Sequence, residues 1–127
     1  TSAIASSEAG RLEDWIHAFL LGEGDNRAFS DGLRKKDRIY YPPVKLPLDQ
    51  FERSCGPEEG MPYPVEEGGF WSRIQRIQDR FLNTDWDMPP LIANIDTDVF
   101  VLNDGNHRYE ALRQLGINSY WVIRWKS

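Results

Sequence analysis

The sequence predicts a single α+β domain in which a small mixed sheet is flanked by helices. Three observations support this prediction. The 127 residues suit one compact domain, and helical and strand patterns alternate along the chain. In addition, a buried strand continues into a helix through one glycine in "VFVLNDGNHRYEALRQLG", residues 99–116.

The amino-terminal part of the chain is expected to be helical. Apolar residues recur at helical spacing in "EAGRLEDWIHAFLLGEG", which predicts an amphipathic helix over this segment. His17 lies beside the apolar stripe and is assigned no catalytic role. The preceding "TSAIASSEAG" is small and polar and is interpreted as a frayed terminus.

The middle of the chain is predicted to contain a strand, a long loop and a helix. Alternating apolar residues in "VKLPLDQF" favour a short strand. The Gly-, Pro- and Glu-rich residues 52–69 favour a surface loop of the length that often forms a lid or a wall. A second helical stripe begins at Phe70 and predicts that Trp71 lies in the core, whereas Trp86 is less constrained and is a candidate for lining a pocket.

The carboxy-terminal part is predicted to contain a hairpin, a helix and a last strand. "LIANI" and "VFVLND" are joined by the short turn "DTD", which is typical of a hairpin. A helix is expected from about Asn106 to Leu115, ended by Gly116. The last strand is "NSYWVIRW", with apolar residues on both faces.

Composition limits the classes of function. With 15 Lys and Arg against 20 Asp and Glu the net charge is -5, which disfavours a protein that binds the backbone of nucleic acids. A single cysteine, Cys55, excludes an internal disulfide, and with two histidines a Cys/His zinc site is not expected. Any metal should be a hard ion, Mg²⁺ first. The composition is that of a cytoplasmic protein with no membrane segment.

The strand-to-helix joint is the candidate functional site. Gly105 permits a positive φ or a close ligand approach, and the first backbone N–H groups of the following helix are free to bind phosphate. His107 and Arg108 place positive charge at this helix start, which favours a negative partner. Arg108→Ala is expected to weaken phosphate binding by about 1.5 to 3 kcal/mol and to leave the melting temperature nearly unchanged.

Two other interpretations stay open at this stage. The joint could be a simple turn in which Asp104 or Asn106 caps the helix, and the partner of Arg108 could be one of the protein's own carboxylates. The basic cluster Arg34, Lys35, Lys36 and Arg38 could be a solvated face or a cationic wall of the phosphate pocket.

The segment "PLIANIDTDVFVLNDGNHRYEALRQLGINSYWVIRW" resembles the core of the ParB and sulfiredoxin superfamily. The resemblance implies a ParB/sulfiredoxin-like domain over residues 44–127 and an N-terminal helical extension over residues 1–43. It also implies a loop at Gly105, Asn106, His107 and Arg108 that binds the phosphates of ATP or ADP, with CTP as an alternative. Sulfiredoxins carry their catalytic cysteine where this chain has Asn106, so sulfinic-acid repair is not expected.

The Asp-Gly-x-His-Arg form of the loop is similar to that of the free-serine kinases of this superfamily. This similarity implies Mg²⁺-dependent phosphoryl transfer to, or hydrolysis from, a small molecule. Asp104 would then assist the substrate or hold Mg²⁺, His107 would contact phosphate as a cation or as a neutral donor, and Glu66 or Glu67 would be the base. For both glutamates, stabilisation of a helix start is the alternative interpretation.

Two further classes of function are kept as alternatives. One is a nucleotide-responsive binding module without turnover, which would contact a protein partner through its amino-terminal helix. The other is a ParB-like nuclease, which the acidic composition makes the weaker alternative. The expected ligands are therefore a nucleotide and a small-molecule acceptor, while nucleic acid is not expected.

Overall fold

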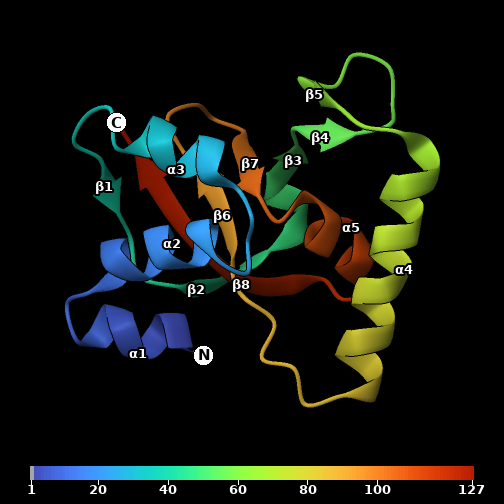
Figure 1. Ribbon diagram of the computed structural model, residues 1–127, viewed down its shortest axis with the longest axis horizontal. Coiled ribbons are helices and arrows are strands. Elements are labelled where there is room, and N and C mark those ends of the chain that lie inside the picture. Colours follow the sequence, from blue (N-terminus) through green and yellow to red (C-terminus); the bar gives the residue numbers. More distant parts are fainter. Residues whose placement is uncertain (1) are drawn as a thin grey trace.

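The computed structural model describes residues 2–127, and its centre is a six-stranded mixed sheet (Figure 1). The strand order is β1-β8-β6-β7-β3, and β2 also pairs with β8. The strands of this sheet are β1 (Ile39–Tyr40), β2 (Val44–Pro47), β3 (Phe51–Arg53), β6 (Leu91–Asn94), β7 (Phe100–Asp104) and β8 (Ser119–Lys126). A separate small parallel pair consists of β4 (Cys55–Gly56) and β5 (Tyr63–Pro64).

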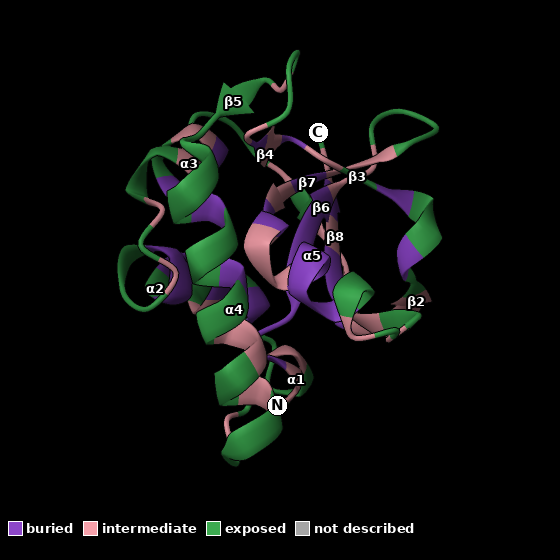
Figure 2. Cartoon of the chain, turned by 90° about the vertical axis from the view of Figure 1, so that its right-hand side faces the viewer, coloured by how far each residue is buried: buried purple, intermediate pink, exposed green. Residues whose placement is uncertain are grey.

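Helices cover both faces of the sheet. They are α1 (Ser2–Glu8), α2 (Leu12–Leu21), α3 (Arg27–Leu33), α4 (Glu67–Asn83) and α5 (Asn106–Gln114), with a 3-10 turn η1 at Leu48–Gln50. Ile92 of β6 packs in the cluster formed by α1, α2 and α3, while its neighbours Leu91 and Ala93 pack with α5 on the opposite face. Leu91, Ile92 and Ala93 are therefore all fully buried, and α4 lies outside α5 (Figure 2).

Most predicted elements are confirmed. The first amphipathic stripe forms α2, the second forms α4, and the helix after Gly105 is α5. The predicted hairpin is β6 and β7, which pair antiparallel, and the final strand is β8. The predicted α+β domain is the observed architecture. Among residues 2–127, no helix combines the length and hydrophobicity needed to cross a membrane.

Two expectations about packing are wrong. The amino terminus is not frayed over residues 2–8, because Ala3 is buried against α2 and the indole of Trp15 donates a hydrogen bond to Ser2 Oγ; Thr1 lies outside the described residues. Trp71 is not in the core but 38% exposed, because the adjacent Phe70 takes the buried position on α4. In both cases tertiary contacts, rather than the local sequence pattern, determine whether the segment is ordered or the side chain is buried.

The N-terminal extension and the rest of the chain share one core. Within residues 1–43, β1 pairs antiparallel with β8, directly beside the pairing of β2 with the same strand. Ile16 and Leu20 of α2 are fully buried and pack in one cluster with Ile123 of β8. The sequence boundary between the two predicted parts therefore falls between two neighbouring strands of one sheet.

An irregularity in the hairpin also affects the direction of the strand-to-helix joint. The register of β6 and β7 is irregular, since Ile92 pairs with Asp104 whereas Ala93 pairs with Leu102. An extra residue of this kind, here Asn103, bends a strand and redirects the side chains beside it. Asn103 accepts a hydrogen bond from the Trp125 indole, and Asp104 ends the strand at the wall of a cavity.

Candidate functional site

The strand-to-helix joint has the backbone geometry that the sequence predicts. Gly105 has a φ of +93° and precedes the first residue of α5. A Cβ at this position would stand 2.8 Å from a methyl carbon of Leu91 and 2.9 Å from Arg108 Nη2, so no side chain fits. The first internal bond of the helix runs from Tyr109 N to Gly105 O. The three preceding N–H groups therefore have no acceptor within the helix.

Arg108 lies at the cavity but is held by the protein itself. Its Nη2 donates to the Pro90 carbonyl oxygen at 3.0 Å and to Asp104 Oδ2 at 3.3 Å. The side chains of Arg108 and Asp104 are only 11% and 9% exposed, and the guanidinium lies over the Phe19 ring. Among residues 2–127, Arg108 Nε is buried without a hydrogen-bond partner. The negative partner of Arg108 is thus one of the protein's own carboxylates, Asp104, as the alternative interpretation of the sequence proposed. Arg108 therefore supports the fold as well as the cavity wall.

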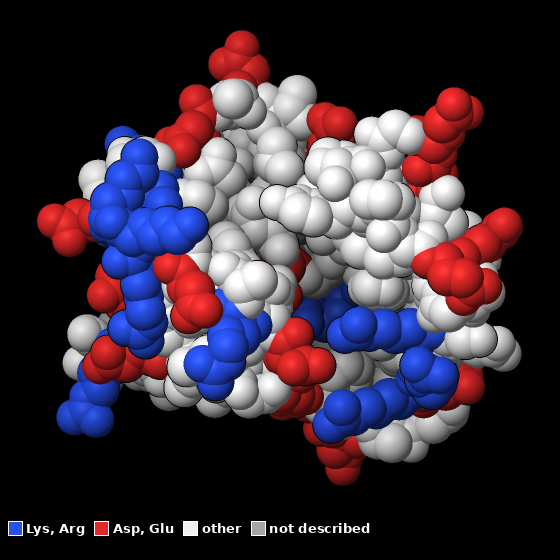
Figure 3. Space-filling model, turned by 45° about the horizontal axis from the view of Figure 1, so that its top comes forward, with Lys and Arg blue, Asp and Glu red and all other residues white. Residues whose placement is uncertain are grey.

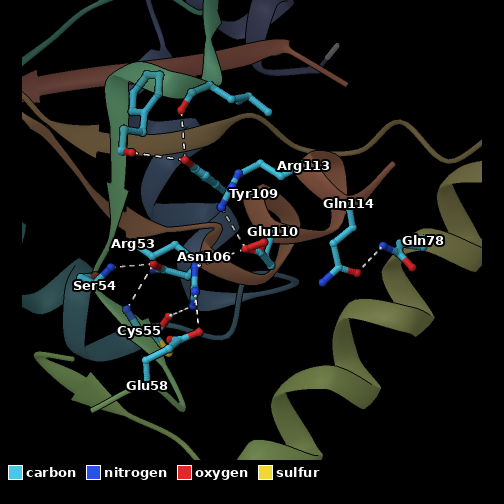
Figure 4. Close-up of polar contacts among 12 residues, drawn as sticks. Arg53, Ser54, Cys55, Glu58, Gln78, Asn106, Tyr109, Glu110, Arg113 and Gln114 are labelled. Atoms are coloured by element: carbon cyan, nitrogen blue, oxygen red, sulfur yellow. Dashed lines mark hydrogen bonds and ion pairs between the residues drawn. The ribbon is translucent and has the colours of Figure 1, made fainter. Parts of the chain in front are cut away.

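Asn106 has a structural role that sequence reasoning missed. Its Oδ1 accepts hydrogen bonds from the backbone N–H groups of Ser54 and Cys55 (Figure 4). Its Nδ2 donates to the Leu102 carbonyl oxygen. The side chain is buried, so it joins the β3–β4 segment to β7 and α5 rather than pointing freely at a ligand. Any phosphate contact by Asn106 therefore falls to its backbone N–H, as expected for the first residue of a helix.

His107 is neutral at physiological pH in the ligand-free protein. Its ring packs against Phe70, with 4.8 Å between the ring centroids. Burial, together with the charges of Arg73, Arg108 and Arg53, lowers the pKa of His107 from 6.5 to about 4. Of the two protonation states considered from the sequence, the neutral one is therefore favoured before an anion binds. A bound phosphate would oppose the arginine charges and raise this pKa.

The titration of His107 can be measured directly. Because the folded-state pKa is lowered, the unfolded chain binds the proton first, so the free energy of unfolding should fall as the pH drops from about 6.5 to about 4. NMR of the imidazole resonances should show a midpoint near pH 4 for the signal that disappears in His107→Gln. A midpoint between 6 and 7 for that signal would show that the ring is solvated.

Asp104 is a poor metal ligand in this arrangement. Its Oδ1 accepts from Asn26 Nδ2 at 3.0 Å, and its Oδ2 accepts from Arg108. Across residues 2–127, the structure contains no group of three or more His, Cys, Asp or Glu side chains that could hold a metal ion. Since Mg²⁺ often binds through one or two carboxylates together with substrate phosphates, a metal would have to arrive with its ligand. The side chains of the described residues therefore do not form a metal site by themselves.

A cavity of about 730 Å³ opens at the joint. Residues 103–108 form one wall, the α2–α3 loop and α3 form a second, and α4 forms a third. Three arginines of α4 line it, and sequence reasoning did not single them out: Arg73, Arg76 and Arg80. Their spacing of three and four places them on one helix face, which is the signal that could have identified them. Figure 3 shows basic side chains gathered beside a hollow on the α4 side.

The other predicted candidates lie elsewhere. Glu66 is the N-cap of α4 and accepts hydrogen bonds from Gly68 N and Gly69 N, and neither Glu66 nor Glu67 lines the cavity. None of the basic residues 34–36 and 38 lines it either, and Arg38 instead binds the carbonyl oxygens of Gly32 and Leu33. The structure therefore favours the helix-start interpretation for Glu66 and does not bring the predicted bases to the joint.

The long loop and Trp86 do reach the cavity. Cys55 and Tyr63 of residues 52–69 line it, which agrees with the predicted wall, although β4 and β5 give this segment more order than the sequence indicated. Trp86 also lines the cavity, so its pocket-lining alternative is confirmed. Burial raises the pKa of the Cys55 thiol, which disfavours the thiolate form.

Comparison with known proteins supports the fold. Neither protein-family models nor curated proteins match this chain. The crystal structure of sulfiredoxin from Arabidopsis thaliana matches with a TM-score of 0.50 and 20% identity, over 67% of this chain and 85% of that one. Two structures of a pNOB8-like ParB N-domain match with TM-scores of 0.46 and 0.45 and identities of 14% and 13%; each match covers 72% of this chain but only 30% and 32% of the ParB chains. The chain therefore has a sulfiredoxin-like fold, in agreement with the fold that its sequence predicts.

Proposed function

We propose that this domain binds a nucleotide or another phosphorylated ligand, with the phosphates at the start of α5. One observation carries the proposal: the residues with free helix N–H groups and the arginines of α4 line the same cavity. The N–H groups supply directed donors and a helix dipole, and Arg73 and Arg76 supply positive charge from the α4 wall of the same cavity. A phosphate group in this cavity would accept from the N–H groups and pair with the arginines.

The charge distribution supports an anionic ligand. The chain as a whole carries a net charge of -5, yet Arg73, Arg76, Arg80 and Arg108 converge on one cavity whose acidic lining residues are Glu23, Asp25 and Asp104. Two of these carboxylates are already paired, Asp104 with Arg108 and Glu23 with Arg80. Arg73 and Arg76 make no ion pair among residues 2–127, so they are the charges available to a ligand.

Binding has stronger support than turnover. A cavity of about 730 Å³ is within the size range of small-molecule and cofactor sites. Phosphoryl transfer to a small-molecule hydroxyl remains the second candidate, but the carboxylate at the cavity wall, Asp104, already accepts hydrogen bonds from Asn26 and Arg108. It would also need a free carboxylate to orient the attacking hydroxyl, and Glu66 and Glu67 do not line the cavity. A screen for ADP or phosphate release with hydroxyl acceptors separates the two functions.

The binding proposal predicts a specific loss of affinity in Arg73→Ala. Dissociation constants for tripolyphosphate and ATP, each with and without Mg²⁺, should rise about tenfold, because a charge-assisted contact contributes about 1.5 kcal/mol. Isothermal titration calorimetry measures this change. Since Arg73 is exposed, the melting temperature should stay nearly unchanged.

Lys36→Ala is the matched control. It removes the same unit of charge from the basic cluster that does not line the cavity, so its effect should stay below about twofold at physiological salt, where long-range attraction is screened. Equal losses in the two variants would show that net charge rather than the cavity controls affinity. Absence of any binding to the wild type at millimolar ligand would refute the proposed function.

A further inference from the structure

We infer that the ligand is a nucleotide whose base lies against Trp86, in a subsite that the N-terminal extension helps to form. The inference rests on the proposed function and extends it, because it specifies an aromatic group attached to the phosphates. The cavity has two chemically different regions. Residues 104–108 and Arg73 form a polar region, while Trp86, Pro89 and Ile77 add an apolar and aromatic lining.

Trp86 is presented as a stacking surface. It is half-buried, lines the cavity and carries the Arg80 guanidinium at 4.0 Å from its ring centroid. Its backbone is fixed on both sides, since Trp86 N donates to Thr84 Oγ1 and Trp86 O accepts from Met88 N. The planar Arg80 guanidinium lies over one face of this fixed indole, so an aromatic base can stack on the guanidinium or on the part of the indole that it leaves uncovered.

The α2–α3 loop also borders this subsite. Glu23 Oε1 lies 3.6 Å from Arg80 Nη1, so a carboxylate of the extension contacts the guanidinium that covers Trp86. The following residues are constrained: a Cβ on Gly24 would stand 2.7 Å from the Phe19 ring, and Asn26 donates to Asp104. The extension is therefore tied both to the proposed base subsite and to the joint that would hold the phosphates.

A phosphate chain alone would leave this region unused. The N–H groups of α5 and Arg73 are sufficient for phosphate oxygens, whereas the aromatic face of the indole and the apolar lining offer them no hydrogen bond. A ligand with a base gains the stacking contact in addition. We therefore expect the wild-type protein to bind ATP, CTP or GTP at least about tenfold more tightly than tripolyphosphate.

The test compares these nucleotides with tripolyphosphate in wild type, Trp86→Leu and Trp121→Leu, by calorimetry at one salt concentration. Trp86→Leu should lower the affinity for the preferred nucleotide about tenfold and leave that for tripolyphosphate unchanged. Trp121 is the matched control, because it is also half-buried beneath a cation, Lys45, yet does not line the cavity. Trp121→Leu should therefore leave both affinities unchanged.

The outcomes separate this inference from the proposed function. Equal wild-type affinities for the nucleotides and tripolyphosphate would overturn the base subsite and leave phosphate binding intact. An equal loss for both ligands in Trp86→Leu would also overturn it, because Trp86 would then act through the fold. Binding of neither ligand class to the wild type would refute the proposed function and this inference together.

Discussion

Arg108→Ala should lower the free energy of unfolding by about 3 to 5 kcal/mol, the usual cost of leaving one member of a buried ion pair alone. The substitution would leave the Asp104 carboxylate, 9% exposed, without its cation and the Pro90 carbonyl oxygen without its donor. It would also remove the guanidinium from the face of Phe19. Urea denaturation followed by far-UV circular dichroism measures the change. The structure thus replaces the expectation from sequence that the melting temperature would hardly move.

Arg113→Ala is the matched control for this experiment. Arg113 is also on α5 and also pairs with a carboxylate, Glu110, but its side chain is 55% exposed. An exposed pair of this kind contributes at most about 1 kcal/mol. If both variants lose the same small amount, the Arg108–Asp104 pair is solvated in solution and Arg108 is free to act on ligand alone.

Asn106→Ala should cost about 2 to 4 kcal/mol of folding free energy and should loosen the cavity wall at Cys55. The substitution leaves two backbone N–H groups, of Ser54 and Cys55, without their side-chain acceptor. The Leu102 carbonyl oxygen loses one of its two side-chain donors and keeps the hydrogen bond from Ser54 Oγ. Each buried polar group left without a hydrogen bond costs about 1 to 3 kcal/mol. In Asn106→Ala, the amide hydrogens of Ser54 and Cys55 should exchange faster than in the wild type, and faster than global unfolding of the variant allows.

Asn118→Ala provides the comparison. Asn118 is exposed and contributes its backbone oxygen to Leu48 N, which the substitution preserves. Its unfolding free energy should stay within about 0.5 kcal/mol of the wild type. Unchanged exchange at Ser54 and Cys55 in Asn106→Ala would contradict the role of the Asn106 side chain as the link between the β3–β4 segment and α5.

The parts of the molecule that depend on local pattern could be predicted. Apolar periodicity located α2 and α4, and the glycine between a buried strand and a helix located the start of α5. A positive φ at Gly105 follows from the same local chemistry. These features need only residues that are close in sequence.

The rest of the candidate site depends on distant residues. Asn26 and Asp104 are 78 positions apart, and Asn106 accepts from N–H groups more than 50 positions upstream. No pattern in a single sequence shows such pairs. The arginines of α4 were missed for another reason: their spacing is visible, but an exposed row of charges on a helix is normally a solvated face. Only the packing of α4 beside α5 turns that row towards the joint.

Because the N-terminal helices and the sheet share one core, the domain defined by resemblance differs from the domain defined by folding. By resemblance, the unit begins at Val44, and the helices before it are an addition. By physical chemistry, the same helices shield Ile92, Ile123 and Trp125 from water, so a chain cut at that boundary would present an apolar sheet face to its neighbours. The unit of similarity is therefore smaller than the unit of folding. The helices that the resemblance leaves out are therefore part of what covers the sheet.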